Sequence, residues 1–167
     1  MAGELIDAGQ LTLHPLTVAD AAEMAGVLSS PGLYRFTGGA PPSAAELRDQ
    51  YARQAAGRSP DGLEEWLNWI VRAKAEGQAV GYVQATITEA GQRAEVAWVI
   101  GEQWQGLGHA SAAALALVNW LGARGVTRLQ AHIRPGHVAS AAVARRAGLR
   151  RTGLVEGGEE LWTAGSA

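Results

Sequence analysis

The stretch Trp104-Gln105-Gly106-Leu107-Gly108-His109-Ala110-Ser111, residues 104–111, sets two glycines one residue apart at a junction between two apolar runs. The run that ends at Ile100 predicts a strand, and the alanine-rich run that begins at Ala112 predicts a helix. Glycine here leaves the first N–H groups of the helix uncovered, at the positive end of the helix dipole. The junction therefore suits an anion such as a phosphate group.

The charge distribution around the junction favours the same kind of ligand. The net charge is only −2, but residues 104–155 contain no Asp or Glu and hold three of the four histidines together with seven arginines: Arg124, Arg128, Arg134, Arg145, Arg146, Arg150 and Arg151. Such an asymmetry indicates contact with a polyanion, either nucleic acid or a small phosphorylated cofactor. A basic surface without any ligand is an equally weighted alternative.

Composition restricts the class of protein. A chain of 167 residues with 47% hydrophobic and 18% charged residues is typical of one globular domain. The absence of cysteine excludes disulfides, thiol catalysis and cysteine-ligated metals. No apolar run approaches the ~18 residues of a membrane span, and residues 1–10 lack the features of a signal peptide. We expect a cytoplasmic protein without a membrane partner, in which residues 1–10 are a loose extension of a single domain over residues 1–167.

Periodicity and turn residues predict an α/β (α+β) fold with a mixed, mostly antiparallel sheet of about seven strands and about four helices. Three consecutive strands, over residues 65–73, 79–88 and 93–100, are predicted to form an antiparallel meander. The other predicted elements are a strand over 11–16, helices over 17–28, 43–56, 108–123 and 138–147, and strands over 126–133, 150–155 and 159–163.

Two common phosphate-binding motifs fit the glycine junction poorly. A P-loop requires Gly-Lys-Ser/Thr, and the sequence has no lysine after Lys74. A dinucleotide-binding loop would have serine at position 111, where a third glycine or alanine is needed. That motif also needs an acid about 20 residues later, and none lies between Glu102 and Glu156.

A third motif gives a better match. Gln105-x-x-Gly108-x-Ala110 resembles the Gln/Arg-x-x-Gly-x-Gly/Ala loop of the GNAT superfamily of N-acetyltransferases. WVIGEQWQGLGHASAAAL and HIRPGHVASAAVARRAGLRRTG are similar to two blocks of the RimJ/RimL-like branch, which acetylates ribosomal-protein N-termini and related amines. The resemblance covers nearly the whole chain. It implies a GNAT-like fold whose sheet is splayed at the cofactor site. Two departures are His137, where asparagine is usual, and the absence near Ala144 of a tyrosine that many members carry.

The resemblance implies acetyl-coenzyme A as acetyl donor and no metal. It assigns the pyrophosphate to the backbone of Gln105, Gly106, Leu107, Gly108, His109 and Ala110, and the pantetheine amides to the open strand edge at Val99, Ile100 and Gly101. His137 is a further cofactor contact. Arg145, Arg146 or Arg150 would reach the terminal phosphate, and we take Arg145 as the candidate.

Two residues are candidates for the proton transfers. Glu95 shares a strand face with Ala97 and Val99, at the place where many family members carry a general base. A cross-strand ion pair with Arg72 or Arg93 is an equally weighted alternative for Glu95. Ser140 matches the serine of the later block and would protonate or hydrogen-bond the leaving thiolate. Its alternative is a capping role at the start of a helix.

The acceptor amine would be surrounded, by family analogy, by the first two helices and the last hairpin, with Tyr34, Trp66 and Trp162 as an apolar wall. Trp66 and Trp69 face opposite sides of one strand, so at least one of them belongs to the core. A protein N-terminus, a polyamine, an antibiotic amine and an amino acid remain open as acceptors, as do a monomer and a homodimer.

These features predict an acetyl-coenzyme A-dependent N-acetyltransferase that acts on a primary amine. The alternative is a non-catalytic acyl-coenzyme A-binding or regulatory module with the same fold. Nucleic acid is disfavoured because the net charge is negative and the arginines are not interleaved with exposed aromatic residues.

Overall fold

The predicted meander forms the middle of the sheet in the computed structural model, which describes residues 3–165. Strands β3 (Glu65–Ala73), β4 (Ala79–Thr88) and β5 (Arg93–Ile100) pair antiparallel in sequence order and have the predicted bounds. Glycine is needed at position 81 because an added Cβ would collide with the Val99 carbonyl oxygen. The two strands therefore approach more closely there than a side chain would allow.

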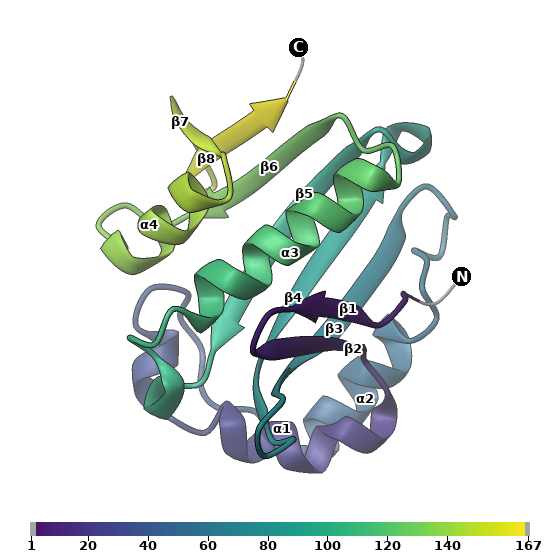
Figure 1. Cartoon of the computed structure of the whole chain (residues 1–167), viewed down its shortest axis with the longest axis vertical. Helices are drawn as coiled ribbons and strands as arrows, with labels where there is room; N and C mark the ends of the chain where they lie inside the picture. Colours follow the sequence, from purple (N-terminus) through teal and green to yellow (C-terminus); the bar gives the residue numbers. More distant parts are fainter. Residues whose placement is uncertain (1–2, 166–167) are drawn as a thin grey trace.

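The full sheet has eight strands in the order β1-β2-β3-β4-β5-β6-β8-β7 (Figure 1). The remaining strands are β1 (Ile6–Ala8), β2 (Leu11–Pro15), β6 (Arg128–Ile133), β7 (Arg150–Glu156) and β8 (Glu159–Gly165). All neighbours pair antiparallel except β5 and β6. The predicted mixed, mostly antiparallel sheet is confirmed, with one strand more than expected.

The additional strand, β1, corrects the expectation of a loose extension over residues 1–10. Ile6 and Ala8 are buried, and β1 pairs with β2 through a turn at Gly9, where φ is +74°. The Trp69 indole also donates to the Glu4 carbonyl, at 2.7 Å. Residues 1 and 2 lie outside the described part of the chain.

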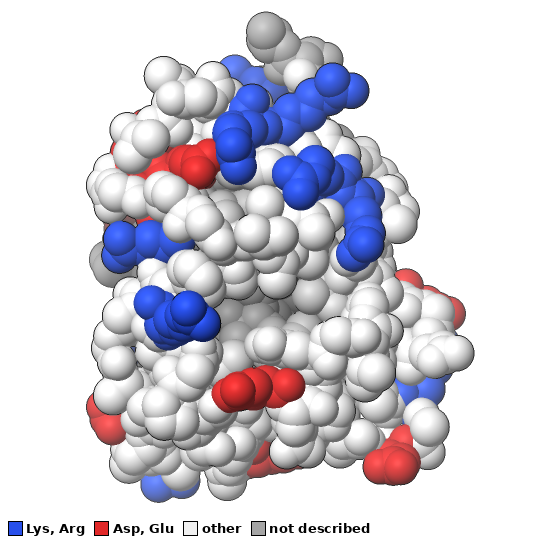
Figure 2. Space-filling view, turned by 90° about the vertical axis from the view of Figure 1, so that its left-hand side faces the viewer, with Lys and Arg blue, Asp and Glu red and all other residues white. Residues whose placement is uncertain are grey.

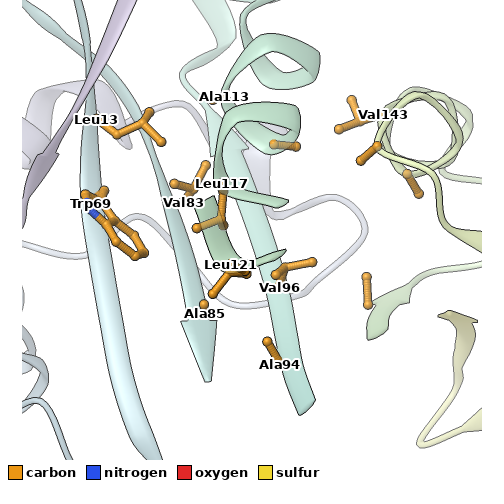
Figure 3. Close-up of a cluster of buried hydrophobic side chains, with 14 of the residues drawn as sticks. Leu13, Trp69, Val83, Ala85, Ala94, Val96, Ala113, Leu117, Leu121 and Val143 are labelled. Carbon is orange, nitrogen blue, oxygen red and sulfur yellow. The ribbon is translucent and has the colours of Figure 1, made fainter. Parts of the chain in front are cut away.

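Four helices cover the two faces of the sheet. Helices α3 (His109–Ala123) and α4 (Val138–Arg146) lie on one face, and α1 (Ala21–Val27) and α2 (Ala44–Gln54) pack on the other. Figure 3 shows the core under α3, where Leu117 and Leu121 meet Val83 and Val96. Within residues 3–165, no helix combines the length and hydropathy needed to cross a membrane.

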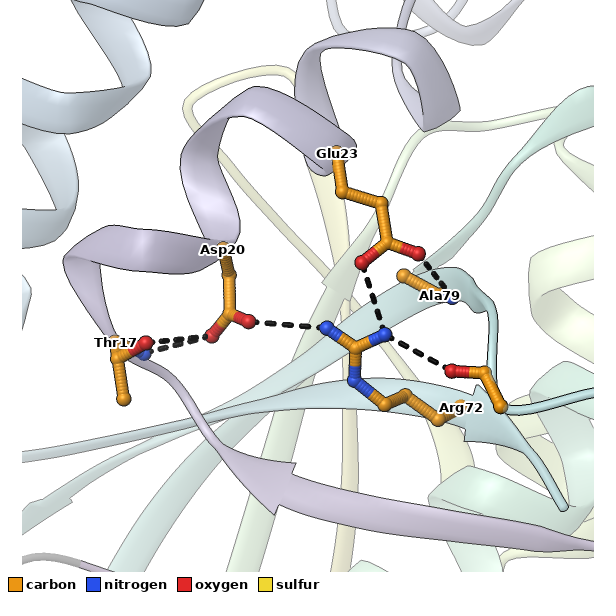
Figure 4. A network of polar contacts seen from close by, with 6 residues as sticks. Thr17, Asp20, Glu23, Arg72 and Ala79 are labelled. Carbon is orange, nitrogen blue, oxygen red and sulfur yellow. Dashed lines mark hydrogen bonds and ion pairs between the residues drawn. The ribbon is translucent and has the colours of Figure 1, made fainter.

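A polar network fixes α1 to the sheet (Figure 4). The Arg72 guanidinium on β3 contacts Asp20 at 3.0 Å and Glu23 at 2.9 Å. Glu23 also accepts from the Ala79 N–H at 2.8 Å, and Asp20 forms a capping box with Thr17. Arg72 therefore sets the position of α1, and α1 covers the sheet only around β4 and its neighbours.

Candidate functional site

The sheet opens between β5 and β6, as the predicted splay requires. These parallel strands pair only from Arg93 to Glu95 on β5 and from Arg128 to Gln130 on β6. Beyond that point no further residue pairs join them, so the later half of β5 has one unpaired edge. The gap begins beyond Glu95, where β5 and β6 run apart (Figure 1).

The backbone groups that face the gap follow from strand alternation. The Gly101 N–H donates to the Val80 carbonyl at 2.8 Å, so the groups of Val99 also point toward β4. Those of Trp98 and Ile100 consequently face the gap. The expectation that Val99 offers its amide to a ligand is thus shifted to Trp98, a residue that was not among the sequence candidates.

The carboxyl end of β5 is held by close packing. The Ile100 carbonyl accepts from the Gln105 side-chain amide at 2.9 Å. A Cβ added at Gly101 would lie 2.7 Å from the Trp104 ring and 2.9 Å from the Val27 carbonyl oxygen. Gln105 therefore orients the loop through its side chain, and Gly101 allows α1 and the loop to approach each other.

The N-terminus of α3 is open, as the glycine pattern predicted. Gly108 is the N-cap residue with φ +82°, Gly106 has φ +78°, and neither would bring an added Cβ within 4 Å of another group. Within the described chain no side chain caps this helix, and its first turn contains no acid. The first helical N–H groups, of His109 and Ala110, are thus left for an anion.

Basic side chains border this end of the molecule. Figure 2 shows Lys and Arg side chains gathered above a hollow, with an acidic side chain on its lower rim. Arg146 donates to the Ser111 hydroxyl at 3.1 Å, beside the start of α3. Arg145 instead lies over the Trp162 ring, 5.7 Å from its centroid. Arg146 is therefore the arginine placed next to the start of α3, and the role of Arg145 at the terminal phosphate stays a prediction.

His137 takes over the capping role of the asparagine that is usual at its position. Its Nδ1 accepts from the Ser140 N–H at 3.4 Å, and its ring stacks on Phe36 with centroids 4.2 Å apart. Burial lowers the pKa of His137, which keeps the ring in the neutral form that can accept this bond. The contact with Phe36 also joins α4 to the loop after α1.

Ser140 lies in α4 and is turned toward the gap. Its hydroxyl oxygen accepts from the Trp98 indole N–H at 3.0 Å, which links α4 to β5. His137 already caps the helix, so the alternative of Ser140 as the cap residue is wrong. Ala144, where many family members have tyrosine, is fully buried.

A polar row crosses the sheet on the face opposite α3. Consecutive register partners on β3, β4, β5 and β6 are Trp66, Thr86, Glu95 and Gln130. The row is only partly buried, because α1 and α2 pack against other residues of this face, such as Ile70. Trp66 and Glu95 therefore share a half-open surface beside the gap.

Glu95 belongs to a four-residue cluster at the end of this row. Its Oε1 accepts from the Gln130 amide at 2.9 Å and contacts His132 Nδ1 at 2.7 Å. Glu156 contacts the other ring nitrogen of His132 at 2.9 Å. The expected alternative, an ion pair of Glu95 with an arginine, is wrong, since Arg72 contacts Asp20 and Glu23 and Arg93 contacts Glu89.

His132 and Glu156 were absent from the sequence candidates. The parallel pairing of Glu95 with Gln130 brings His132 to the same face, two residues further along β6. Burial disfavours a charge on His132, but the hydrogen bonds and charges of Glu156 and Glu95 outweigh it and raise its pKa. Only the register of β5 against β6, which the sequence pattern did not supply, would have identified this cluster.

The structure separates the three proposed acceptor residues. Tyr34 follows α1 and donates from its hydroxyl to the Leu28 carbonyl at 3.0 Å. Trp66 lies on the Glu95 face, whereas Trp69 is fully buried, as the prediction for this pair required. Trp162 is 2% exposed and packs in the core under α4, opposite Ala131. The structure therefore does not support Trp162 as part of an acceptor wall.

A cleft formed by described residues lies away from the gap between β5 and β6. An open cleft of about 370 Å³ lies at the far end of the sheet, between Leu63, Ile87 and Arg124. Within residues 3–165, no group of three or more His, Asp or Glu side chains is arranged to hold a metal ion. The residues that line this cleft are therefore separate from those at the gap.

Residues 10–150 match the protein family described as Acetyltransferase (GNAT) domain. The match covers most of the chain, and the protein belongs to this family. A comparison with curated proteins finds no match to the sequence.

Solved structures support the same fold. RimL, a ribosomal L7/L12 alpha-N-protein acetyltransferase in complex with coenzyme A, is 19% identical, with a TM-score of 0.77 and coverage of 97% of this chain and 98% of that chain. The ribosomal-protein-S5-alanine acetyltransferase of Vibrio fischeri is 17% identical, with a TM-score of 0.79 and coverage of 98% and 97%. Aminoglycoside acetyltransferase AAC(6')-Ib, solved with paromomycin and acetyl-coenzyme A, is 21% identical, with a TM-score of 0.77 and coverage of 94% of both chains.

Two glycines of α3 provide a matched test of the open helix start. Gly108→Ala forces a side chain into a left-handed conformation and is expected to lower the free energy of unfolding by about 1–2 kcal/mol. Gly122→Ala, in the last turn of α3 with open space around it, is expected to raise it by about 0.5 kcal/mol. Urea denaturation of both variants measures the difference. Equal effects of the two substitutions would contradict the assigned backbone geometry.

The cap formed by His137 is expected to make stability depend on pH. Its pKa is lowered in the folded state, so its contribution is present above the ordinary value of 6.5 and is lost as pH falls through the lowered value. His137→Asn keeps a cap that does not titrate. The wild type should therefore lose stability relative to His137→Asn when denaturation is compared at about pH 7.5 and about pH 5.5. A constant difference between these pH values would contradict the capping role.

Proposed function

We propose that this protein is an acetyl-coenzyme A-dependent N-acetyltransferase that transfers an acetyl group to a primary amine. One observation carries the proposal: β5 pairs with β6 only as far as Glu95 and then runs with an unpaired edge toward the uncapped start of α3. This arrangement offers an anion site and a carboxylate at the two ends of one opening. Membership of the GNAT family supports the same chemistry.

The chain's own residues fit coenzyme A. Added Cβ atoms at Gly106 and Gly108 meet nothing within 4 Å, so the backbone around them is open to a pyrophosphate. Trp98 and Ile100 present backbone groups to a pantetheine arm along the unpaired edge of β5. Arg146 adds positive charge beside Ser111. When bound, acetyl-coenzyme A supplies the activated acetyl thioester.

Glu95 is the proposed general base. An amine must be neutral to attack a thioester, and a lysine-like amine with a pKa near ~10.4 is almost fully protonated at neutral pH. The Glu95 side chain is 45% exposed and lies where β5 and β6 separate. A carboxylate at the point where the two strands separate is placed to accept a proton from an amine that approaches across the polar row.

Ser140 is the proposed proton donor to the leaving thiolate. Its oxygen is occupied as an acceptor by the Trp98 indole, so its own proton is free to be donated. The Trp98 bond also holds the hydroxyl at the gap. A buried Ala144 in place of the usual tyrosine leaves this role to Ser140.

The acceptor is proposed to lie on the half-open face that carries Glu95 and Trp66, with Tyr34 as a further wall residue. The carboxylates of Glu95 and Glu156 favour a cationic amine there. The acceptors named for the similar structures are of two kinds, ribosomal proteins and aminoglycosides. Both kinds carry amines, so both are tested.

One observation favours the second candidate, a non-catalytic acyl-coenzyme A-binding module: the buried alanine at position 144 removes a proton donor that many family members use. Such a module would bind acetyl-coenzyme A and release no thiol with any amine. The two candidates therefore differ in turnover and agree in binding.

Turnover is measured as thiol release from acetyl-coenzyme A with kanamycin, spermidine, an amino acid and a peptide with a free α-amine. We expect release with at least one acceptor, a loss of about 100-fold in kcat for Glu95→Gln, and a smaller loss for Ser140→Ala. Glu76→Gln, in the exposed turn after β3, is the control and should leave the rate unchanged. Acetyl-coenzyme A binding without thiol release from any acceptor would establish the module instead.

A further inference from the structure

His132 joins two carboxylates that come from different strands. Nδ1 lies 2.7 Å from Glu95 Oε1, and Nε2 lies 2.9 Å from Glu156 Oε1. The three side chains therefore form a continuous path from β5 through β6 to β7. The ring is 23% exposed, while Glu156 at the outer end is 58% exposed. The path leads from Glu95, where β5 and β6 separate, to solvent at Glu156.

The two oxygens of Glu95 have different surroundings. Gln130 and His132 both contact Oε1. Within residues 3–165, no protein group hydrogen-bonds to Oε2. One oxygen is thus held by the path, and within residues 3–165 the other has no protein partner. This division suits a carboxylate that takes a proton on one side and passes it on at the other.

Acetylation of a charged amine releases one proton per turnover. The ammonium first loses a proton to become the neutral nucleophile. Its nitrogen then forms the new bond to the acetyl carbon, the carbon–sulfur bond breaks, and a second amine proton ends on the thiolate. The first proton has no acceptor among the products, so it must leave the site.

We propose that His132 is the positioning and relay residue that carries this proton from Glu95 to Glu156 and to solvent. The inference rests on the proposed function. Glu95 accepts the ammonium proton at Oε2, and after rotation of the carboxyl group the proton passes to Nδ1 of a neutral ring. Nε2 then gives its own proton to Glu156, which exchanges it with water. The ring ends neutral, as its other tautomer. Loss of the Nδ1 proton to water and uptake of a proton at Nε2 through Glu156 restore the starting tautomer before the next turnover.

The electrostatic surroundings of His132 support this relay. The charged groups that face the ring are Glu95 on β5 and Glu156 on β7, and its partner on β8 is the uncharged Leu161. The two carboxylates raise the pKa of His132 despite its partial burial. The ring therefore gains and loses its proton above the ordinary pKa of 6.5.

The test compares pH profiles of kcat for the wild type, His132→Gln, Glu156→Gln and the control His14→Gln, with the best acceptor of the panel above. His14 lies on β2, away from the cluster. We expect a rising limb with a midpoint above pH 6.5 in the wild type and in His14→Gln. His132→Gln should lose this limb and about 100-fold in kcat near pH 7, with the KM for acetyl-coenzyme A unchanged. Glu156→Gln should show a smaller loss.

A second variant separates proton transfer from a structural contribution. His132→Ala should recover activity when imidazole is added to the buffer, whereas Glu95→Gln should not. Wild-type turnover with an unchanged profile in His132→Gln, or no imidazole rescue of an inactive but folded His132→Ala, would overturn the relay and leave the proposed function intact. Absence of thiol release by the wild type with every acceptor would overturn the proposed function, and the relay with it.

Discussion

The short parallel contact between β5 and β6 is the constraint on which the rest of the structure depends. Three residue pairs hold these strands together, and then they diverge. If pairing continued, the unpaired edge at Trp98 would be filled and the start of α3 would face a closed sheet. The early separation instead creates an opening whose ends are a carboxylate at Glu95 and an uncapped helix at Gly108. The bond from the Trp98 indole to Ser140 bridges the opening from β5 to α4.

The two faces of the sheet carry different kinds of groups. One face carries α3 and α4, and Arg146 lies beside the helix start that suits an anion. On the other face, Arg72 ties α1 to β3 and β4. That tie leaves the polar row beside β5 only partly covered. Under the proposed function, the phosphate groups of the cofactor lie beside Arg146 and the amine lies beside the carboxylates of Glu95 and Glu156.

Local patterns in the sequence were sufficient for much of this architecture. Period-two alternation defined the bounds of β3, β4 and β5, and the spacing of Gly106 and Gly108 indicated the open helix start. Local patterns could not predict features that depend on how the strands and helices are placed against one another. Strand β1 is only three residues long, too short for a periodic signal. Arg145 and Arg146 are adjacent in sequence, and only the orientation of α4 decides which one lies beside Ser111. His132 reaches Glu95 solely through the parallel register.

The most direct test of the gap as the cofactor site is a crystal structure of the protein with acetyl-coenzyme A bound. We predict the pyrophosphate on the backbone N–H groups between Gly106 and Ala110, and the pantetheine arm along β5 at Trp98 and Ile100. The thioester should lie between Glu95 and Ser140. Acetyl-coenzyme A bound elsewhere, such as in the cleft beside Leu63 and Arg124, with the gap between β5 and β6 left empty, would contradict this assignment.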